Sequence, residues 1–150
     1  MSLLYQLAEI ELIYRSKVSP SSRPKITCSR DAYKVFLQAW DKNKLEFIEQ
    51  AKIMLLNRAG HVLGLCNIST GGTAGTVVDP KQVFVAALKA NASSILLAHN
   101  HPSCSLKPSA ADIALTNKLK EAGRFLDIAV HDHLIVTKEG YYSFADELGL

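Results

Sequence analysis

Apolar residues in this chain fall into short continuous runs separated by polar segments, a pattern typical of buried strands. The clearest run is residues 95–98, four apolar residues bounded by polar ones, which predicts a strand buried on both faces of a sheet. Further strands are predicted at residues 49–57, 61–69, 127–130, 133–137 and 141–144. The first two of these runs are joined by the short Asn/Gly segment 57–60, which indicates a β-hairpin.

Helical periodicity occupies the segments between several of these strands. Helices are predicted at residues 30–41, 80–90 and 109–122. Their expected N-terminal capping residues are Ser29, Asp79 and Ser109. The second helix has Pro80 at its first position and ends before Asn91, a residue type that tolerates the left-handed conformation found at helix ends. Strands and helices alternate in the middle of the chain, so the pattern predicts an α/β (mixed α+β) fold, in which helices pack on a mixed sheet.

The chain is expected to form a single domain over residues 29–150, preceded by an N-terminal extension over residues 1–28. Within this extension, residues 9–17 alternate in part between polar and apolar, which predicts an edge strand. Residues 19–24 are rich in Ser and Pro and have the composition of a loop. A chain of 150 residues fits one domain and buries a sizeable core.

The composition is that of a globular protein, with 48% apolar and 21% charged residues. No apolar run is long enough to span a bilayer, so no membrane partner is expected. The short apolar start lacks a basic leader and is soon followed by Glu9 and Glu11, which argues against a signal peptide. The three cysteines are Cys28, Cys66 and Cys104. They are widely spaced and odd in number, which favours free thiols in a reducing cytoplasm.

Positive charge is concentrated near the start of the chain, although the formal net charge is only +3. The basic residues between positions 13 and 40 are Arg15, Lys17, Arg23, Lys25, Arg30 and Lys34. Asp31 is the one acidic residue in the same interval. We interpret this basic stretch, residues 15–34, as a solvated surface, with a contact to DNA phosphate or to an acidic partner as the alternative.

The polar residues that follow the apolar run have the spacing of a metal site. Alternate side chains of a strand project to the same side, so His99 and His101 point together while Asn100 points away. Asp112 lies in the first turn of the helix that Ser109 caps, where it is well placed to supply a third ligand. Two imidazoles and one carboxylate suit a catalytic zinc ion, which makes water a nucleophile near neutral pH. The spacing therefore predicts Zn2+ bound by His99, His101 and Asp112.

The pattern His99-x-His101-x7-Ser109-x2-Asp112 resembles the JAMM motif of JAB/MPN metalloprotein domains. More closely, the sequences LAHNHPS at residues 97–103 and DHLIV at residues 132–136 resemble the C-terminal domain of RadC-type proteins, over about residues 29–150. The resemblance implies the MPN-like fold, a curved mixed sheet with helices around it. It also implies a short form of the family, because residues 1–28 leave no room for the helix-hairpin-helix region of longer members.

The resemblance further assigns roles around the zinc ion. The family has a catalytic Glu on an earlier strand, and Glu49 stands where that residue belongs, with Glu46 as a nearby competitor. Glu49 would act as the general base, and the Ser109 hydroxyl would support the oxyanion. Family members cleave peptide or isopeptide bonds, so the resemblance implies a zinc-dependent hydrolase that attacks an amide or isopeptide carbonyl of an unidentified substrate.

Two other classes of function stay open at this point. RadC-like proteins carry a DNA-repair label and many occur on mobile elements, so one alternative is a DNA-associated module that uses the basic stretch. The other is a metal-stabilised interaction domain without turnover, and the oligomeric state is open between a monomer and a homodimer. Zinc deaminases and zincin proteases are excluded, because the chain contains neither Pro-Cys-x-x-Cys nor His-Glu-x-x-His.

Several of these residues also have simpler explanations. Ser109 needs no role beyond the N-cap, and Asp112 has the position of a capping-box acid, a role that competes with a metal for the same oxygens. Cys104 replaces the Gly more common in the RadC-like pattern, and we interpret it as an incidental loop residue, with a soft metal ligand as the alternative. For His131 and His133 we expect structural roles, or the orientation of a ligand imidazole, rather than a second metal site.

Overall fold

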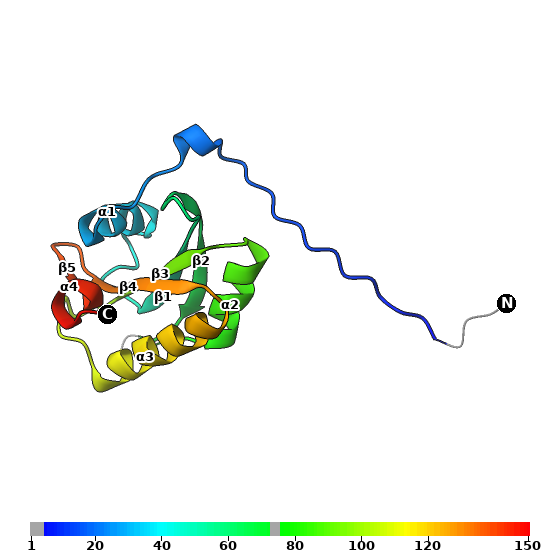
Figure 1. Cartoon of the computed structure of the whole chain (residues 1–150). Helices are drawn as coiled ribbons and strands as arrows, with labels where there is room; N and C mark the ends of the chain where they lie inside the picture. Colours follow the sequence, from blue (N-terminus) through cyan, green and yellow to red (C-terminus); the bar gives the residue numbers. More distant parts are fainter. Residues whose placement is uncertain (1–4, 73–75) are drawn as a thin grey trace.

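A five-stranded mixed sheet forms the centre of the molecule (Figure 1). The computed structural model describes residues 5–72 and 76–150. The strands are β1 (Gln50–Leu56), β2 (Val62–Thr70), β3 (Ser94–Asn100), β4 (Ala129–Val136) and β5 (Tyr141–Ser143). Their order is β2-β1-β3-β4-β5, in which β3 and β4 are parallel and all other neighbours are antiparallel. The mixed sheet that the sequence pattern predicts is therefore confirmed.

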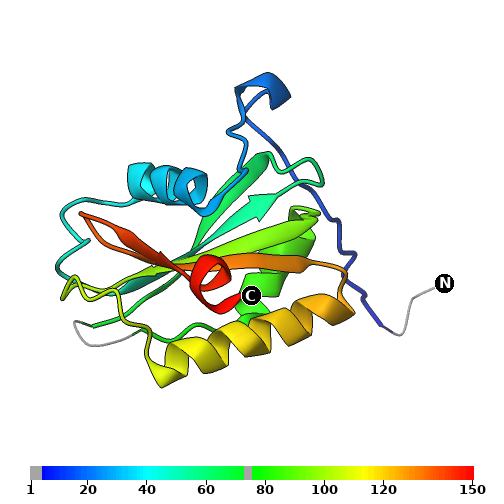
Figure 2. The same ribbon diagram turned by 60° about the vertical axis from the view of Figure 1, so that its left-hand side comes forward.

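Helices cover both faces of this sheet, with α1 on one face and both α2 and α3 on the other (Figure 2). The helices are α1 (Ser29–Ala39), α2 (Pro80–Lys89), α3 (Ala110–Phe125) and α4 (Phe144–Leu148), with a 3-10 turn η1 (Pro20–Ser22) before them. Within residues 5–72 and 76–150, no helix is both long enough and apolar enough to cross a membrane.

The alternation of side chains along β3 divides the core into two layers. Ile95 and Leu97 pack with α2 and α3, whereas Leu96 and Ala98 pack with α1. All seven residues of β3 are buried, so the prediction of a strand buried on both faces is confirmed. His99 is the next side chain in the first of these series, and it therefore projects toward the layer that contains α3.

The helix starts follow the capping rules at two of the three expected positions. The side chain of Asp79 accepts a hydrogen bond from the Lys81 backbone N–H, and Ser109 accepts one from the Asp112 backbone N–H. Helix α1 forms where it was predicted, but its predicted cap is wrong, because Cys28 occupies the cap position and Ser29 is the first helical residue. The Ser29 hydroxyl instead contacts the hydroxyl of Tyr141 at 2.9 Å.

The two strands predicted at residues 127–130 and 133–137 are a single strand, β4, and this part of the prediction is wrong. The polar residues that suggested a gap lie within the strand at a β-bulge. Val130 pairs with Ile95 and Asp132 pairs with Leu96, so His131 is an extra residue without a partner on β3. The bulge reverses the alternation of side chains along β4, and His133 consequently faces the α3 layer.

The edge strand predicted at residues 9–17 does not form. These residues are extended and exposed, and the segment runs away from the sheet (Figure 1). Its closest link to the sheet is the Tyr14 hydroxyl, which donates a hydrogen bond to the backbone carbonyl of Leu63 in β2 at 2.9 Å. An alternating pattern becomes a strand only where a neighbour completes its backbone hydrogen bonds, and none of the five described strands is paired with residues 9–17.

Candidate metal centre

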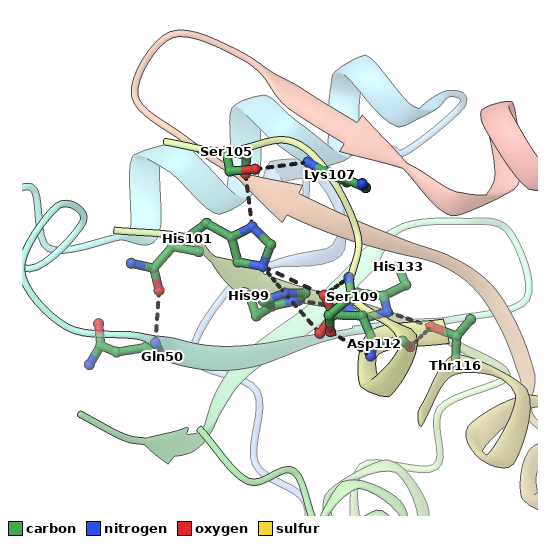
Figure 3. A network of polar contacts seen from close by, with 10 residues as sticks. Gln50, His99, His101, Ser105, Lys107, Ser109, Asp112, Thr116 and His133 are labelled. Carbon is green, nitrogen blue, oxygen red and sulfur yellow. Dashed lines mark hydrogen bonds and ion pairs between the residues drawn. The ribbon is translucent and has the colours of Figure 1, made fainter. Parts of the chain in front are cut away.

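One end of the sheet brings the predicted site residues together. Strands β1 and β3 are antiparallel, with Ala51 paired to His99, so the start of β1 meets the end of β3. Glu49 directly precedes β1 and His101 directly follows β3. Helix α3 begins at the same end of the sheet, and Asp112 in its first turn faces the two imidazoles (Figure 3).

The two histidines and Asp112 bring three possible ligand atoms close together. His99 Nε2 and His101 Nε2 lie 2.9 Å apart. Asp112 Oδ1 lies 3.4 Å from His99 Nε2, and Asp112 Oδ2 lies 3.6 Å from His101 Nε2. Ligand atoms of a tetrahedral zinc site, each about 2.0–2.2 Å from the metal, are about 3.3–3.6 Å from one another. The two separations to Asp112 match this range, whereas the two histidine nitrogens are closer together, at hydrogen-bond distance, and would move apart slightly around such an ion.

Asn100 points away from this group, as the alternation predicts. Its side-chain amide donates to the backbone carbonyls of Leu45 and Ile48, at 2.7 and 2.9 Å. Its side-chain oxygen accepts from the backbone N–H of Gln50 at 2.7 Å. The fully buried Asn100 thus attaches the segment that precedes β1 to the end of β3, and this contact helps to hold Glu49 beside the histidines.

The hydrogen bonds of His101 indicate what this group can bind. His101 Nδ1 lies 2.8 Å from the carbonyl oxygen of Ser105. A carbonyl only accepts, so Nδ1 carries a proton, and a neutral His101 presents the lone pair of Nε2 to His99 and Asp112. Lone pairs that converge on a carboxylate are stabilised by a positive charge. A metal ion, or a proton on His101, supplies that charge, and Asp112 accordingly raises the pKa of the His101 imidazole.

The carboxylate of Asp112 has two roles at once. Oδ2 accepts a hydrogen bond from the Ser109 backbone N–H at 2.8 Å, which completes the capping box of α3. Oδ1 faces His99 Nε2 and remains free of that bond. Burial raises the pKa of the Asp112 carboxyl, but the adjacent imidazoles of His101 and His99 and the Ser109 backbone N–H outweigh this effect and hold the pKa well below its usual range. Asp112 is therefore ionised in the pH range in which a metal would bind.

Glu49 lies beside the histidines, and Glu46 does not. One carboxylate oxygen of Glu49 and one nitrogen from each of His99 and His101 lie within 4.8 Å of one another, a group that could hold a metal ion. Glu49 is half-buried, and burial raises the pKa of its carboxyl group. Glu46 is exposed and lines a separate groove with Phe47. The role of Glu49 as a base stays a prediction, but the geometry favours it over Glu46.

Glu49, His101 and Asp112 line a cleft of about 500 Å³. Ser109 lines the cleft next to Asp112, which places its hydroxyl beside the predicted metal ligands. Its hydroxyl oxygen accepts the Asp112 N–H at 3.0 Å, and the hydroxyl proton stays available to a bound molecule. The rest of the lining is mostly polar and includes Thr76, Ser103, Ser105 and Lys107.

Sequence reasoning missed Thr116, and it left the role of His133 open. His133 is fully buried beneath His99, with its Nε2 2.7 Å from His99 Nδ1 and its Nδ1 2.6 Å from Thr116 Oγ1 (Figure 3). Burial lowers the pKa of His133 well below its ordinary value. Thr116 lies one helical turn after Asp112, and this spacing was the available signal that both residues share one face of α3.

The remaining candidates lie outside this group. Cys104 is exposed and its thiol contacts the Pro102 carbonyl rather than the histidines. Its φ of 65° is left-handed, which gives a physical reason for a Gly at this position in the RadC-like pattern. His131, displaced by the bulge, lines a different cavity of about 350 Å³ together with Asp132. Within the described parts of the chain, neither His131 nor His133 belongs to a second metal-capable group.

The basic stretch is also separate from the cleft. Arg15 and Lys17 lie on the extended segment, Arg23 and Lys25 lie in the loop before α1, and Lys34 lies on α1 itself. None of these described side chains lines the cleft that contains Glu49 and His101.

Comparison with known proteins agrees with the motif. The family model of the RadC-like JAB domain matches residues 26–150. A UPF0758 protein of Flavobacterium johnsoniae is 42% identical over 123 residues, which are 82% of this chain and 52% of that protein. A UPF0758 protein of Alkaliphilus metalliredigens is 37% identical over 142 residues, 94% of this chain and 60% of that protein. One of Porphyromonas gingivalis is 39% identical over 129 residues, 83% of this chain and 54% of that protein. The chain thus spans between half and two thirds of the length of these relatives.

Proposed function

The chain belongs to the RadC-like JAB domain family, and from this premise we propose that it is a zinc-dependent hydrolase of peptide or isopeptide bonds. One observation carries the proposal. His99 Nε2, His101 Nε2 and the carboxylate of Asp112 converge at separations of 2.9 to 3.6 Å, at a cleft that Glu49 also lines. JAB domains include hydrolases, and two imidazoles with one carboxylate form a ligand set of catalytic zinc sites.

His99, His101 and Asp112 would hold the zinc ion in this proposal. The ion would supply Lewis-acid chemistry, which polarises a carbonyl group and makes water nucleophilic near neutral pH. Glu49 would accept a proton from the attacking water and deliver it to the leaving amine. Its raised pKa supports this role, because a base works best when its pKa approaches the working pH. The Ser109 hydroxyl would donate a hydrogen bond to the oxyanion that forms from the carbonyl.

The first test is the metal content of protein purified without added metal or chelator. We expect about one zinc ion per wild-type chain by elemental mass spectrometry, because one metal-capable group is present within residues 5–72 and 76–150. His101→Ala should lose the metal, since it removes one of the two imidazoles. His131→Ala is the matched control, because His131 is an exposed histidine outside the cleft, and this variant should keep the metal. Wild-type protein that takes up no metal even when zinc is offered would refute the hydrolase and leave the DNA-associated module as the leading alternative.

The second test separates the proposed base from the proposed ligands. Glu49→Gln keeps the size of the side chain and removes its capacity to accept a proton. We expect this variant to retain zinc and to lose about 10²–10⁴-fold in turnover of a fluorogenic peptide or isopeptide substrate, the usual contribution of a general base. Glu46→Gln is its control and should match the wild type. A fully active Glu49→Gln variant would remove Glu49 from the mechanism.

A further inference from the structure

We propose that Thr116 and His133 are positioning residues, which fix the tautomer of His99 so that its Nε2 presents a free lone pair to the cleft. The inference rests on the proposed metal site, because it explains how one of the ligands is prepared for a metal. Its basis is a continuous set of hydrogen bonds that leads from the first turns of α3, through β4, to the end of β3 (Figure 3).

The first step is the direction of the Thr116 hydroxyl. Thr116 Oγ1 lies 2.9 Å from the backbone carbonyl oxygen of Asp112, one turn earlier in α3. A carbonyl oxygen only accepts, so the single hydroxyl proton of Thr116 is directed to Asp112. Thr116 Oγ1 also lies 2.6 Å from His133 Nδ1. With its proton already used, the hydroxyl oxygen accepts in this second bond, and Nδ1 of His133 must carry the donated proton.

The second step is the state of His133 itself. Its ring is fully buried and stacks on Phe144, with ring centroids 4.4 Å apart and the planes 8° from parallel. Its two ring nitrogens bond to Thr116 and His99, and neither bonds to a carboxylate. A buried imidazolium without an anionic partner is costly, so the neutral ring is favoured. A neutral His133 with its proton on Nδ1 has a lone pair on Nε2.

The third step derives the tautomer of His99 from that of His133. His133 Nε2 and His99 Nδ1 lie 2.7 Å apart, so the acceptor on His133 requires a proton on His99 Nδ1. The other nitrogen of a neutral His99, Nε2, then has no proton. That atom faces Asp112 and lies 2.9 Å from His101 Nε2, so in the metal-free protein it accepts from a proton on His101. Metal ligation by histidine needs this unprotonated nitrogen, and a hydrogen-bonded partner on the opposite nitrogen is the usual means of obtaining it.

The chain of bonds also begins and ends at proposed ligands. Asp112 accepts from Thr116 through its backbone, and His99 donates to His133 through its ring. The relative placement of α3 and β3 at the cleft is therefore tied to the same bonds that set the tautomer. Without the Thr116 hydroxyl, the Nδ1 proton of buried His133 would lack an acceptor. The favourable response is that His133 carries its proton on Nε2 and donates it to His99 Nδ1. The proton of His99 is then on Nε2.

Nitrogen-15 NMR of the imidazoles of metal-free protein at neutral pH tests this order directly, because the two ring tautomers have different nitrogen shifts. In the wild type we expect the proton on Nδ1 of both His99 and His133. Thr116→Val, which keeps the shape of the side chain and removes the hydroxyl, should move the His99 proton to Nε2. Thr116→Ser, which keeps the hydroxyl, should restore the wild-type pattern. A wild-type His99 protonated at Nε2, or a Thr116→Val spectrum with unchanged tautomers, would overturn the proposal.

Zinc affinity, measured by competition with a chromophoric chelator, supplies the second readout. Thr116→Val should bind zinc about 10–100-fold more weakly than the wild type, the usual effect of losing such a partner, and Thr116→Ser should bind it within about twofold. Equal affinity of Thr116→Val and wild type would contradict the proposal. If the wild type binds no zinc, the proposed function fails, but the NMR comparison still decides the tautomer. If Thr116→Val does not fold, the wild-type spectrum alone decides it.

Discussion

At the scale of single residues, the half-buried Asp112 and the buried Asp132 have different roles. Asp112 lies at the cleft and is held in its ionised form, with Oδ1 directed to His99. Asp132 lies in β4, where it pairs with Leu96 of β3, and accepts only structural hydrogen bonds. Its Oδ1 accepts from the backbone N–H groups of His133 and Ala145, at 2.7 and 3.0 Å, and its Oδ2 accepts from the Ser143 hydroxyl at 2.6 Å. These bonds connect β4 to the start of α4.

Asp132 should make the stability of the protein depend on pH. Burial raises the pKa of the Asp132 carboxyl, although its hydrogen bonds with Ser143, Ala145 and His133 partly oppose this. Between the ordinary pKa and the raised one, the native protein holds a proton that the unfolded chain has released. The contribution of Asp132 to the free energy of unfolding is therefore largest at low pH, and it falls by up to about 1.4 kcal/mol per pH unit as pH rises through this window.

Urea unfolding of wild type and Asp132→Asn at several pH values from 4 to 7 measures this contribution. The asparagine oxygen can accept from both backbone N–H groups, and its amide can donate to Ser143, so the geometry is kept without a titrating group. The stability of the wild type relative to Asp132→Asn should decline as the pH is raised. A difference that stays constant over this range would show that the Asp132 pKa is not raised in the folded state.

The sequence indicated the proposed metal ligands more clearly than Thr116 and His133, the residues that contact them from the interior. His99, His101 and Asp112 could be identified because their spacing reflects local geometry, the alternation of a strand and the first turn of a helix. The contact between Thr116 and His133 joins residues 17 positions apart and depends on how α3 lies on β4. No local pattern encodes that packing. The left-handed conformation of Cys104 is a local feature, but it could not be predicted either, because a cysteine does not indicate a positive φ.

At the scale of elements, the turn from α3 into β4 sets the relative position of the two elements that carry Thr116 and His133. The Ile128 backbone N–H donates to the Gly123 carbonyl oxygen at 2.9 Å, which closes the end of α3 against the start of β4. A side-chain carbon at Gly123 would clash with the carbonyl oxygen of Ile128. This glycine is thus required by a close approach of two backbones.

Gly123→Ala should lower the free energy of unfolding by about 2–3 kcal/mol, because a backbone carbonyl cannot move aside as a flexible side chain does. Chemical denaturation of the wild type and the variant measures the difference. Gly64→Ala in β2 is the matched control, since a carbon added there meets no atom within 4 Å, and it should change stability far less. A Gly123→Ala variant as stable as the wild type would mean that α3 and β4 can separate without cost.

Element positions were predictable where the signal is local and not where a tertiary partner decides. The cap at Asp79 and the left-handed Asn91 placed α2 correctly from sequence alone. The bulge at His131 joined two predicted strands into one, because β4 absorbs an extra residue through its pairing with β3. Residues 9–17 have a strand-like pattern but lack a partner strand in this structure.

At the scale of the whole molecule, the proposed metal site joins parts of the chain that are far apart in sequence. Its ligands come from the end of β3, the residue that follows β3 and the first turn of α3, and Glu49 directly precedes β1. The unfolded chain does not bring these groups together, so a metal ion that binds them stabilises the folded state. Zinc at about 100 times its dissociation constant should raise the free energy of unfolding by about 2.7 kcal/mol.

Denaturant unfolding with zinc and with chelator measures this linkage. The midpoint should rise with zinc while the slope with denaturant stays constant, because the surface exposed on unfolding does not change. The His101→Ala variant should show no zinc-dependent shift in midpoint. An equal shift in this variant would mean that zinc stabilises the protein from another place.

The buried amide of Asn100 has a consequence for how the chain avoids misfolding. A strand that slides by one residue exchanges its two faces, and such a slip of β3 would place Asn100 in the cleft and turn His99 into the α1 layer. The three hydrogen bonds of Asn100 to Leu45, Ile48 and Gln50 exist in only one alignment. The slipped alignment would leave those backbone groups, and a buried imidazole, without partners, at a cost of about 1–3 kcal/mol for each group. Asn100 therefore specifies the register of β3, because misaligned forms of this sheet lose its three hydrogen bonds and are less stable. This selection against misaligned forms needs no bound ligand.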